Sequence, residues 1–458
     1  NGSTLSAAME EAPGVPVEVV AALADGEAAG ELHEALFGIA DALESGDLES
    51  LVPAGARARA EAEQTAEASP VVKLVNLIIK YGIEQRASDI HLEPEQDALR
   101  ARYRVDGVLH DTDPVPKRLQ EAVISRMKIM AAMNVAERRL PQDGRIRLNL
   151  AGKELDLRVS TLPAIHGERV TIRILSREQV TLDLRGIGLS EKDLATAQEI
   201  CRRPHGLVLA NGPTGCGKTT FIYSMLNEIN DESRNIMTVE DPVEYDIDGV
   251  SQTQINPARG LTFGRVIRSM LRQDPDVIMA AEIRDAETAN LAVQATMTGH
   301  LFITSLHTNT ADAGLRRLAD IGLEPFLINA AVIASTSQRL VRLLCEQCRQ
   351  EVEPDLHSVP PSVGEYIAET GQKKFYAPGG CEACRGTGYS GRTGVYEILV
   401  PDDSVRQAFA NQAEPGDLRK AAVAAGMKTI LRDGIEKAAR GLTSIEEVMR
   451  VAAETGTR

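Results

Sequence analysis

The chain has no tryptophan, and only 3% of its 458 residues are aromatic. Its hydrophobic cores must therefore be built mainly from alanine, valine, isoleucine and leucine. Hydrophobic residues make up 43% of the sequence and charged residues 25%, which is the composition of a soluble globular protein and excludes a fibrous or wholly disordered chain. One core rarely serves a chain of this length, so we expect roughly two to four domains.

Long hydrophobic runs are also missing. The longest are residues 71–79 and 325–334, and both fall well short of the roughly 18 uncharged residues that a membrane span needs. No segment of the secretory-signal type opens the sequence. We therefore expect a cytoplasmic protein whose contact with a membrane is peripheral.

Positive charge is scarce. The net charge is −16, and residues 1–70 alone contribute −12, with fourteen acidic residues against Arg57 and Arg59. A chain with this balance and no long basic run is a poor candidate for binding the phosphates of a nucleic acid. We read residues 1–69 as an acidic tail or linker.

Cysteine is rare as well, but its spacing is informative. Four of the six cysteines form two CxxC pairs, Cys345 with Cys348 and Cys381 with Cys384, separated by 32 residues. Two such pairs can hold Zn²⁺ in a tetrahedral site, and four sulfur ligands leave no open position, so the metal would be structural. A disulfide or unligated thiols are the alternatives. We place this zinc-binding element at residues 341–398, with a helix inside it at about 362–372.

Residues 70–185 predict a small α+β domain. Apolar residues at helical spacing in 71–79 are followed by strand-like segments, a turn signal at Asp106-Gly107 and a helix at about 121–133. Three alternating segments, RIRLNL, ELDLRVST and ERVTIRIL, complete a mainly antiparallel sheet.

One face of that sheet is predicted to be charged. Alternation directs Leu155, Leu157 and Val159 of one strand, and Val170, Ile172 and Ile174 of the next, to the same side. The opposite side then carries Asp156, Arg158, Arg169 and Arg173, which could meet an anion. A solvated face with internal ion pairs is an equally good interpretation of the pattern.

Beyond about residue 186 the strands become short apolar runs, GLVLA, NIMTV, DVIMAA and LFITS, each followed by helical or loop sequence. This pattern is typical of a largely parallel sheet covered on both faces. We expect this α/β domain to span residues 186–340, with a helical subdomain at 399–458.

The first of these strands runs into the most specific motif of the chain, GxxxxGKT followed by a helical pattern. Its glycines allow backbone N–H groups to face phosphate oxygens, Lys218 reaches the β and γ phosphates, and Thr219 offers a hydroxyl to Mg²⁺. We interpret Cys216 as a small side chain that fills space in the loop rather than as a redox switch. The predicted nucleotide-binding residues are Gly212, Pro213, Thr214, Gly215, Cys216, Gly217, Lys218, Thr219 and Thr220.

Acidic residues and histidines follow the later strands. Glu240 and Asp241 come after one strand and Glu282 after the next, where strand ends converge on a ligand crevice, so Glu282 with Thr219 can anchor Mg²⁺. Each acid alone could instead be a helix cap or a rim charge. His300 and His307 bracket a further strand and could sense the γ phosphate.

These motifs together closely resemble those of the type II secretion and type IV pilus assembly ATPases, the GspE, PulE and PilB group. The matching blocks include ASDIHLEP, QDGRIRL, GPTGCGKTT, TVEDPVEY, LRQDPDVIMAAEIRD, TSLHTNTA and SQRLVRLLC, within residues 70–458. The resemblance implies a homo-hexameric ring of RecA-like P-loop ATPase cores. Each core would be linked to a small, PAS-like α+β domain that caps the neighbour's nucleotide.

The resemblance also implies roles. Lys218 and Thr219 match the Walker A motif, Glu282 the Walker B acid, and Glu240 with Asp241 the aspartate box. His300 and His307 match the histidine box, and Arg158 and Arg173 match arginines brought to the nucleotide phosphates. Ala281 stands where the family usually has glycine, and Cys216 where it usually has serine.

The predicted function is an ATPase that uses ATP, Mg²⁺ and a structural Zn²⁺ to drive pseudopilus or pilus assembly and protein export. Catalysis would rest on Glu282, Glu240, Lys218, Arg158 and Arg173, with Glu282 or Glu240 orienting the water. The partners implied are an inner-membrane platform protein and other copies of the chain, but no nucleic acid. Alternatives are a nucleic acid translocase or conjugation-type ATPase, and an ATP-binding scaffold with little turnover.

Overall fold

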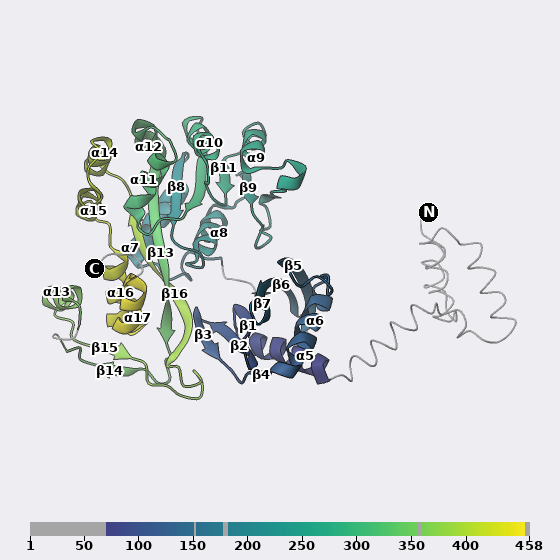
Figure 1. Cartoon of the computed structure of the whole chain (residues 1–458). Helices are drawn as coiled ribbons and strands as arrows, with labels where there is room; N and C mark the ends of the chain where they lie inside the picture. Colours follow the sequence, from purple (N-terminus) through teal and green to yellow (C-terminus); the bar gives the residue numbers. More distant parts are fainter. Residues whose placement is uncertain (1–69, 151–152, 177–181, 356–358, 454–458) are drawn as a thin grey trace, which may run out of the picture. The chain divides into compact units, whose positions relative to one another are not determined.

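The computed structural model describes residues 70–150, 153–176, 182–355 and 359–453 (Figure 1). The acidic tail predicted at 1–69 lies outside these residues. The chain divides into two compact units, with the boundary between Ser176 and Arg177. Leu182 and Leu184 pack into a core of the second unit, so the first unit ends nine residues before the expected position 185.

The first unit is an antiparallel sheet with two helices. The sheet order is β3-β2-β1-β7-β6-β5, and β4 pairs with β2. Its elements are α5 (Pro70–Glu84), β1 (Asp89–Pro94), β2 (Ala98–Val105), β3 (Val108–Asp111), β4 (Val115–Pro116), η2 (Lys117–Leu119), α6 (Gln120–Met130), β5 (Gln142–Leu150), β6 (Lys153–Ala164) and β7 (Gly167–Ser176).

Apolar and charged side chains alternate along β6 and β7, as the sequence predicted. Leu157 and Ile172 are fully buried, and they belong to one core with residues of α5 and α6. The turn between β2 and β3 is also as expected, because Asp106 and Gly107 have φ of 49° and 85° and join the paired residues Val105 and Val108. The helices therefore cover one face of the sheet, and the charged residues lie on the other.

The second unit is built on a seven-stranded sheet in the order β10-β9-β11-β12-β8-β13-β16. All neighbouring strands are parallel except the pair of β13 and β16. Its strands are β8 (Gly206–Asn211), β9 (Ile236–Glu240), β10 (Ser251–Gln254), β11 (Val277–Ala280), β12 (Leu301–Leu306), β13 (Val332–Leu344) and β16 (Tyr389–Leu399), and a separate ladder joins β14 (Gln350–Val352) to β15 (Phe375–Ala377).

Helices cover both faces of this sheet. Along β8, Leu207 and Leu209 join one core while Val208 and Ala210 join the other, as a strand buried on both sides requires. The helices are α7 (Glu191–Arg202), α8 (Lys218–Ile229), η3 (Pro257–Arg259), α9 (Phe263–Met270), α10 (Ala286–Met297), α11 (Ala311–Asp320), α12 (Pro325–Ala331), α13 (Pro361–Thr370), α14 (Asp403–Ala410), α15 (Pro415–Ala424), α16 (Ile430–Ala439) and α17 (Ile445–Ala453).

The C-terminal helices pack in two groups rather than as one subdomain. Residues of α14 and α15, such as Phe409 and Leu418, belong to a main core of the sheet. Ile435 of α16 and Val448 of α17 instead pack with Phe375 of the cysteine-bearing segment. No helix among the described residues combines the length and the apolar character that crossing a membrane requires.

Candidate nucleotide and zinc sites

The loop between β8 and α8 has the geometry of a phosphate cradle. Gly212, Gly215 and Gly217 all have positive φ, at 144°, 78° and 92°, and such values are open to glycine but strained for other residues. Gly217 is the N-cap of α8, so the unpaired N–H groups of the helix start face the loop. Lys218 donates to the carbonyls of Gly212 and Pro213, at 2.6 and 3.0 Å.

Cys216 belongs to this loop. Its side chain is buried, and burial raises the pKa of its thiol. A β-carbon on Gly212 would come within 2.4 Å of the Cys216 sulfur, so the thiol fills the space that the glycine leaves. This packing favours the filler interpretation. Burial also lowers the pKa of Lys218, an effect that the nearby Glu282 carboxylate counteracts.

Glu282 lies among charged residues at the carboxyl ends of the parallel strands. It follows β11, its side chain is 17% exposed, and it forms an ion pair with Arg284 and a 3.2 Å contact with the Nε2 atom of His307. Arg284 also lies 3.8 Å from Asp241. The structure thus brings Glu282, Asp241 and His307 together, and Lys218 lies close enough to feel the charge of Glu282.

Glu240 is held differently from Glu282. It is 2% exposed, and its carboxylate accepts hydrogen bonds from Tyr223, from Thr238 at 2.6 Å and from Gln252 at 3.0 Å. Burial, together with the hydrogen bond to Glu240, raises the pKa of Tyr223. Both carboxylate oxygens are therefore engaged inside the protein, and Glu240 ties β9 to α8 and β10.

The two histidines lie at opposite ends of β12, His300 before the strand and His307 after it. Leu306 of β12 pairs with Asn211 just before the phosphate loop, whereas Leu301 pairs with Gly206 at the start of β8. His300 therefore lies six residues, or roughly 20 Å, along the strand from Leu306, and its Nδ1 contacts the Ala295 carbonyl at 2.8 Å. The expectation that both histidines border one crevice fails for His300, because a strand of six residues separates them.

Arg158 and Arg173 lie in the first unit, directly opposite each other on β6 and β7. Arg173 also donates to Asp89 at 3.2 Å, and Arg169 pairs with Glu93 at 2.7 Å. The face predicted to be charged thus contains ion pairs, although Arg173 remains 59% exposed.

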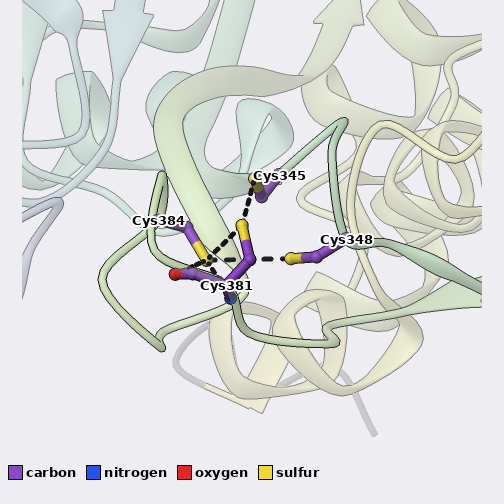
Figure 2. A group of neighbouring side chains, drawn as sticks. All are labelled: Cys345, Cys348, Cys381 and Cys384. Carbon is purple, nitrogen blue, oxygen red and sulfur yellow. Dashed lines mark hydrogen bonds between the residues drawn. The ribbon is translucent and has the colours of Figure 1, made fainter.

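The four cysteines converge as their spacing predicts (Figure 2). Their sulfur atoms lie within 4.8 Å of one another, and this is the one such group of potential metal ligands among the described residues. Three sulfur pairs are separated by 3.7 or 3.8 Å: Cys345–Cys381, Cys348–Cys384 and Cys381–Cys384. A zinc tetrahedron with bonds of about 2.3 Å has edges of about 3.8 Å, whereas a disulfide needs sulfurs about 2.05 Å apart.

Backbone donors surround these sulfurs. The N–H groups of Cys381 and Gly388 point at the Cys384 sulfur, both at 3.1 Å. Burial raises the pKa of Cys384, but these donors outweigh it and hold the pKa at about 6. Gly388 has φ of 74°, and a β-carbon on it would meet Pro378 at 2.3 Å. The glycines of CEACRGTGYSG therefore allow the chain to wrap tightly around the sulfurs, and the donor set fits Zn²⁺.

Sequence analysis missed several residues that build the nucleotide site. Arg284 lies within the quoted motif EIRD and pairs with Glu282. Gln338, within the buried polar stretch 335–339 of β13, donates to the Cys216 carbonyl of the phosphate loop. Its signal is a run of polar residues inside a strand that pairs on both sides, and only the long-range pairing makes that signal readable.

Sequence comparison places the chain in a known family. The model of the family described as Type II/IV secretion system protein matches residues 64–450. The Type II secretion system ATPase E of Vibrio cholerae serotype O1 is 43% identical over 395 residues, which cover 86% of this chain and 77% of that protein. The Type IV pilus assembly ATPase PilB of Thermus thermophilus is 42% identical over 440 residues, or 95% of this chain and 49% of that protein.

Solved structures agree with this assignment. The pilus retraction motor PilT with bound ADP aligns at a TM-score of 0.53 and 26% identity, covering 82% of this chain and 96% of PilT. The ATPase DotB of Legionella pneumophila shares the fold, at a TM-score of 0.59 and 19% identity, covering 83% of this chain and 95% of DotB. From the family match and the identity to its relatives, the chain belongs to the Type II/IV secretion system protein family and is one of its P-loop ATPases.

Proposed function

We propose that the chain works as a homo-hexameric motor that hydrolyses ATP and passes its domain movements to an inner-membrane platform protein of a secretion or pilus system. The observation that carries the proposal is the meeting of a glycine cradle, Lys218 and Glu282 at the carboxyl edge of a parallel sheet, within a chain of this family. In this proposal the second unit is a RecA-like core and the first a PAS-like domain.

The residues divide the chemistry among them. The backbone from Gly212 to Gly217, with Lys218, would bind the phosphates, and Thr219 with Glu282 would hold Mg²⁺, which would help to neutralise phosphate charge. Arg158 and Arg173 would neutralise charge on the transferring phosphoryl group. Asp241 and His307 border the same edge through Arg284 and Glu282.

Glu282 is the better candidate for orienting the attacking water. Its carboxylate is partly exposed and faces His307 and Arg284. Glu240 already accepts three hydrogen bonds in a buried cluster, so we assign it a role in shaping the strand end. The Glu282 side chain is 17% exposed, whereas Glu240 is buried, so the Glu282 carboxylate is the one that water can reach.

Zn²⁺ is proposed as a structural ion held by Cys345, Cys348, Cys381 and Cys384. The supporting observation is the tetrahedral spacing of the sulfurs. When bound, it would cross-link the segment after β13 to the start of β16. The protein would act in the cytoplasm, held at the inner membrane by protein partners.

Steady-state ATPase measurements on the purified chain test the proposal against its rivals. We expect Mg²⁺-dependent turnover that rises as the chain assembles and does not respond to added DNA. Strong stimulation by DNA would favour a translocase, and ATP binding with negligible turnover would favour a scaffold.

A further inference from the structure

β13 (Val332–Leu344) contains an unusual buried polar stretch. Five consecutive residues, Ser335 to Arg339, are polar, and none is more than 2% exposed. Buried polar side chains are costly unless they are hydrogen-bonded. In this stretch Thr336 bonds to the Leu209 carbonyl of β8, and the other four residues bond to two connecting segments. One is the phosphate loop after β8, and the other is the segment 307–311 after β12, which carries His307.

Gln338 bonds to the phosphate loop. Its side-chain amide donates to the Cys216 carbonyl at 3.1 Å. The peptide bond is planar and trans, so the carbonyl of Cys216 and the N–H of Gly217 point in opposite directions. A carbonyl drawn back onto β13 therefore directs the Gly217 N–H toward the mouth of the loop, where a phosphate oxygen would lie.

The fit around Gln338 is close. A β-carbon on Gly217 would lie 3.1 Å from the Gln338 amide nitrogen, and one on Gly212 would lie 3.0 Å from the Gln338 carbonyl. The phosphate loop therefore rests directly on the strand, and its glycines make this approach possible.

Arg339 and Ser337 bond to the histidine-bearing segment. The Arg339 guanidinium donates to the Gln338 carbonyl at 2.8 Å and to the backbone and side-chain oxygens of Asn309 at 3.2 and 3.3 Å. Ser337 donates to the same Asn309 carbonyl at 3.0 Å. A planar guanidinium with several donors suits such a bridge, which a lysine could not reproduce.

We propose that Gln338 and Arg339 are positioning residues: Gln338 presets the phosphate loop for nucleotide, and Arg339, through Asn309, holds the His307 segment in register with it. This inference rests on the nucleotide site proposed above. It assigns the two residues different effects. Loss of the Gln338 donor should weaken nucleotide binding, whereas loss of the Arg339–Asn309 bridge should slow turnover.

The test compares full-length variants by Kd for a fluorescent ADP with Mg²⁺, by kcat and KM for ATP, and by melting temperature. Gln338→Met removes the donor at nearly constant length, and we expect Kd to rise about tenfold, as the loss of a preset phosphate contact predicts. Asn309→Ala changes an exposed residue, so it should fold normally. We expect it, like Arg339→Lys, to lower kcat about fivefold or more while Kd stays within about threefold.

Thr336→Val is the matched control. It removes a buried hydroxyl from the same strand, but that hydroxyl bonds to Leu209 of β8 rather than to either loop. We expect its Kd and kcat to stay within about twofold of the wild type. Its melting temperature should fall about as much as that of Gln338→Met.

Two results would overturn the inference. One is a Kd for Gln338→Met no higher than for Thr336→Val, and the other is an unchanged kcat in Asn309→Ala. If the wild-type chain itself bound no Mg-nucleotide, the proposed function and the inference would both fail. If the wild type bound Mg-nucleotide but the variants gave either of the two results above, the inference alone would fail.

Discussion

At the scale of single residues, Glu282 is surrounded by groups that need its charge. Arg284 and His307 contact it directly, and its charge partly counteracts the lowering of the Lys218 pKa by burial. Removing that charge should affect the reaction more than the binding of nucleotide, because the phosphates are held mainly by the loop and Lys218. In our proposal, these contacts make Glu282 the catalytic acid, and the buried hydrogen bonds of Glu240 give it a structural role.

Glu282→Gln should therefore keep nucleotide binding and lose turnover. We expect kcat to fall by about 100-fold or more, since a carboxylate that orients water or holds Mg²⁺ cannot be replaced by an amide. The measurement is steady-state ATPase activity alongside the Kd for ATP. Glu287→Gln, which changes an exposed acid paired with Arg268, is the control, and an undiminished rate in Glu282→Gln would show that the role is misassigned.

Glu447 predicts a pH dependence of stability. Burial raises its pKa, but hydrogen bonds from Arg450 and Arg342 outweigh this and hold the pKa at about 2. The ordinary value is 4.5, so the carboxylate stabilises the fold above about pH 4.5. That contribution, at most about 3 kcal/mol, is lost as the pH falls toward 2.

Urea unfolding at pH 7 and at pH 3.5 measures this effect. The wild type should lose stability between the two, and Glu447→Gln should be less stable at pH 7 and lose less on acidification. An equal loss in both proteins would mean that other carboxylates dominate the acid response.

At the scale of elements, the parts that were predictable depend on local signals. The turn at Asp106-Gly107, the alternation in β6 and β7, and the strand–loop–helix of the phosphate site all follow from residues close in sequence. β13 could not be read in this way, because its polar residues 335–339 gain partners only when β8 and the segment after β12 come beside them. The sequence correctly predicted that His300 and His307 bracket a strand, and the register of β12 with β8 shows that only His307 follows the strand end beside the phosphate loop.

The zinc element provides a prediction at the same scale. We expect about one zinc per chain, and Cys384→Ser should lower both the zinc content and the melting temperature, because metal binding is coupled to folding. Elemental analysis and thermal unfolding are the measurements. Cys201→Ala, which removes a buried thiol of α7, should leave the zinc content unchanged.

Loss of zinc in Cys384→Ser should also disturb the packing of α16 and α17. Ile435 and Val448 of these helices pack against Phe375 in the segment between the two cysteine pairs. Retention of a full zinc complement in Cys384→Ser would contradict the four-sulfur site.

At the scale of the whole molecule, the proposed chemistry is divided between two units. Lys218 and Glu282 belong to the second unit and Arg158 to the first, with the boundary at residue 176. If the first unit of one chain caps the nucleotide of the next chain in a ring, each complete site takes residues from two chains. Such a site forms only when chains assemble, and its two sets of residues can come from two different variants.

Mixed rings test this division directly. Lys218→Ala and Arg158→Ala should each abolish most ATPase activity alone. When the two chains assemble together in equal amounts, roughly a quarter of the sites should combine an intact Lys218 with an intact Arg158 from the neighbour, and activity should return in proportion. If both residues acted within one chain, every site would keep one defect and mixing would restore nothing. The ATPase rate of co-expressed variants, compared with that of each variant alone at the same total concentration, therefore shows whether the arginine works on its own nucleotide or on its neighbour's.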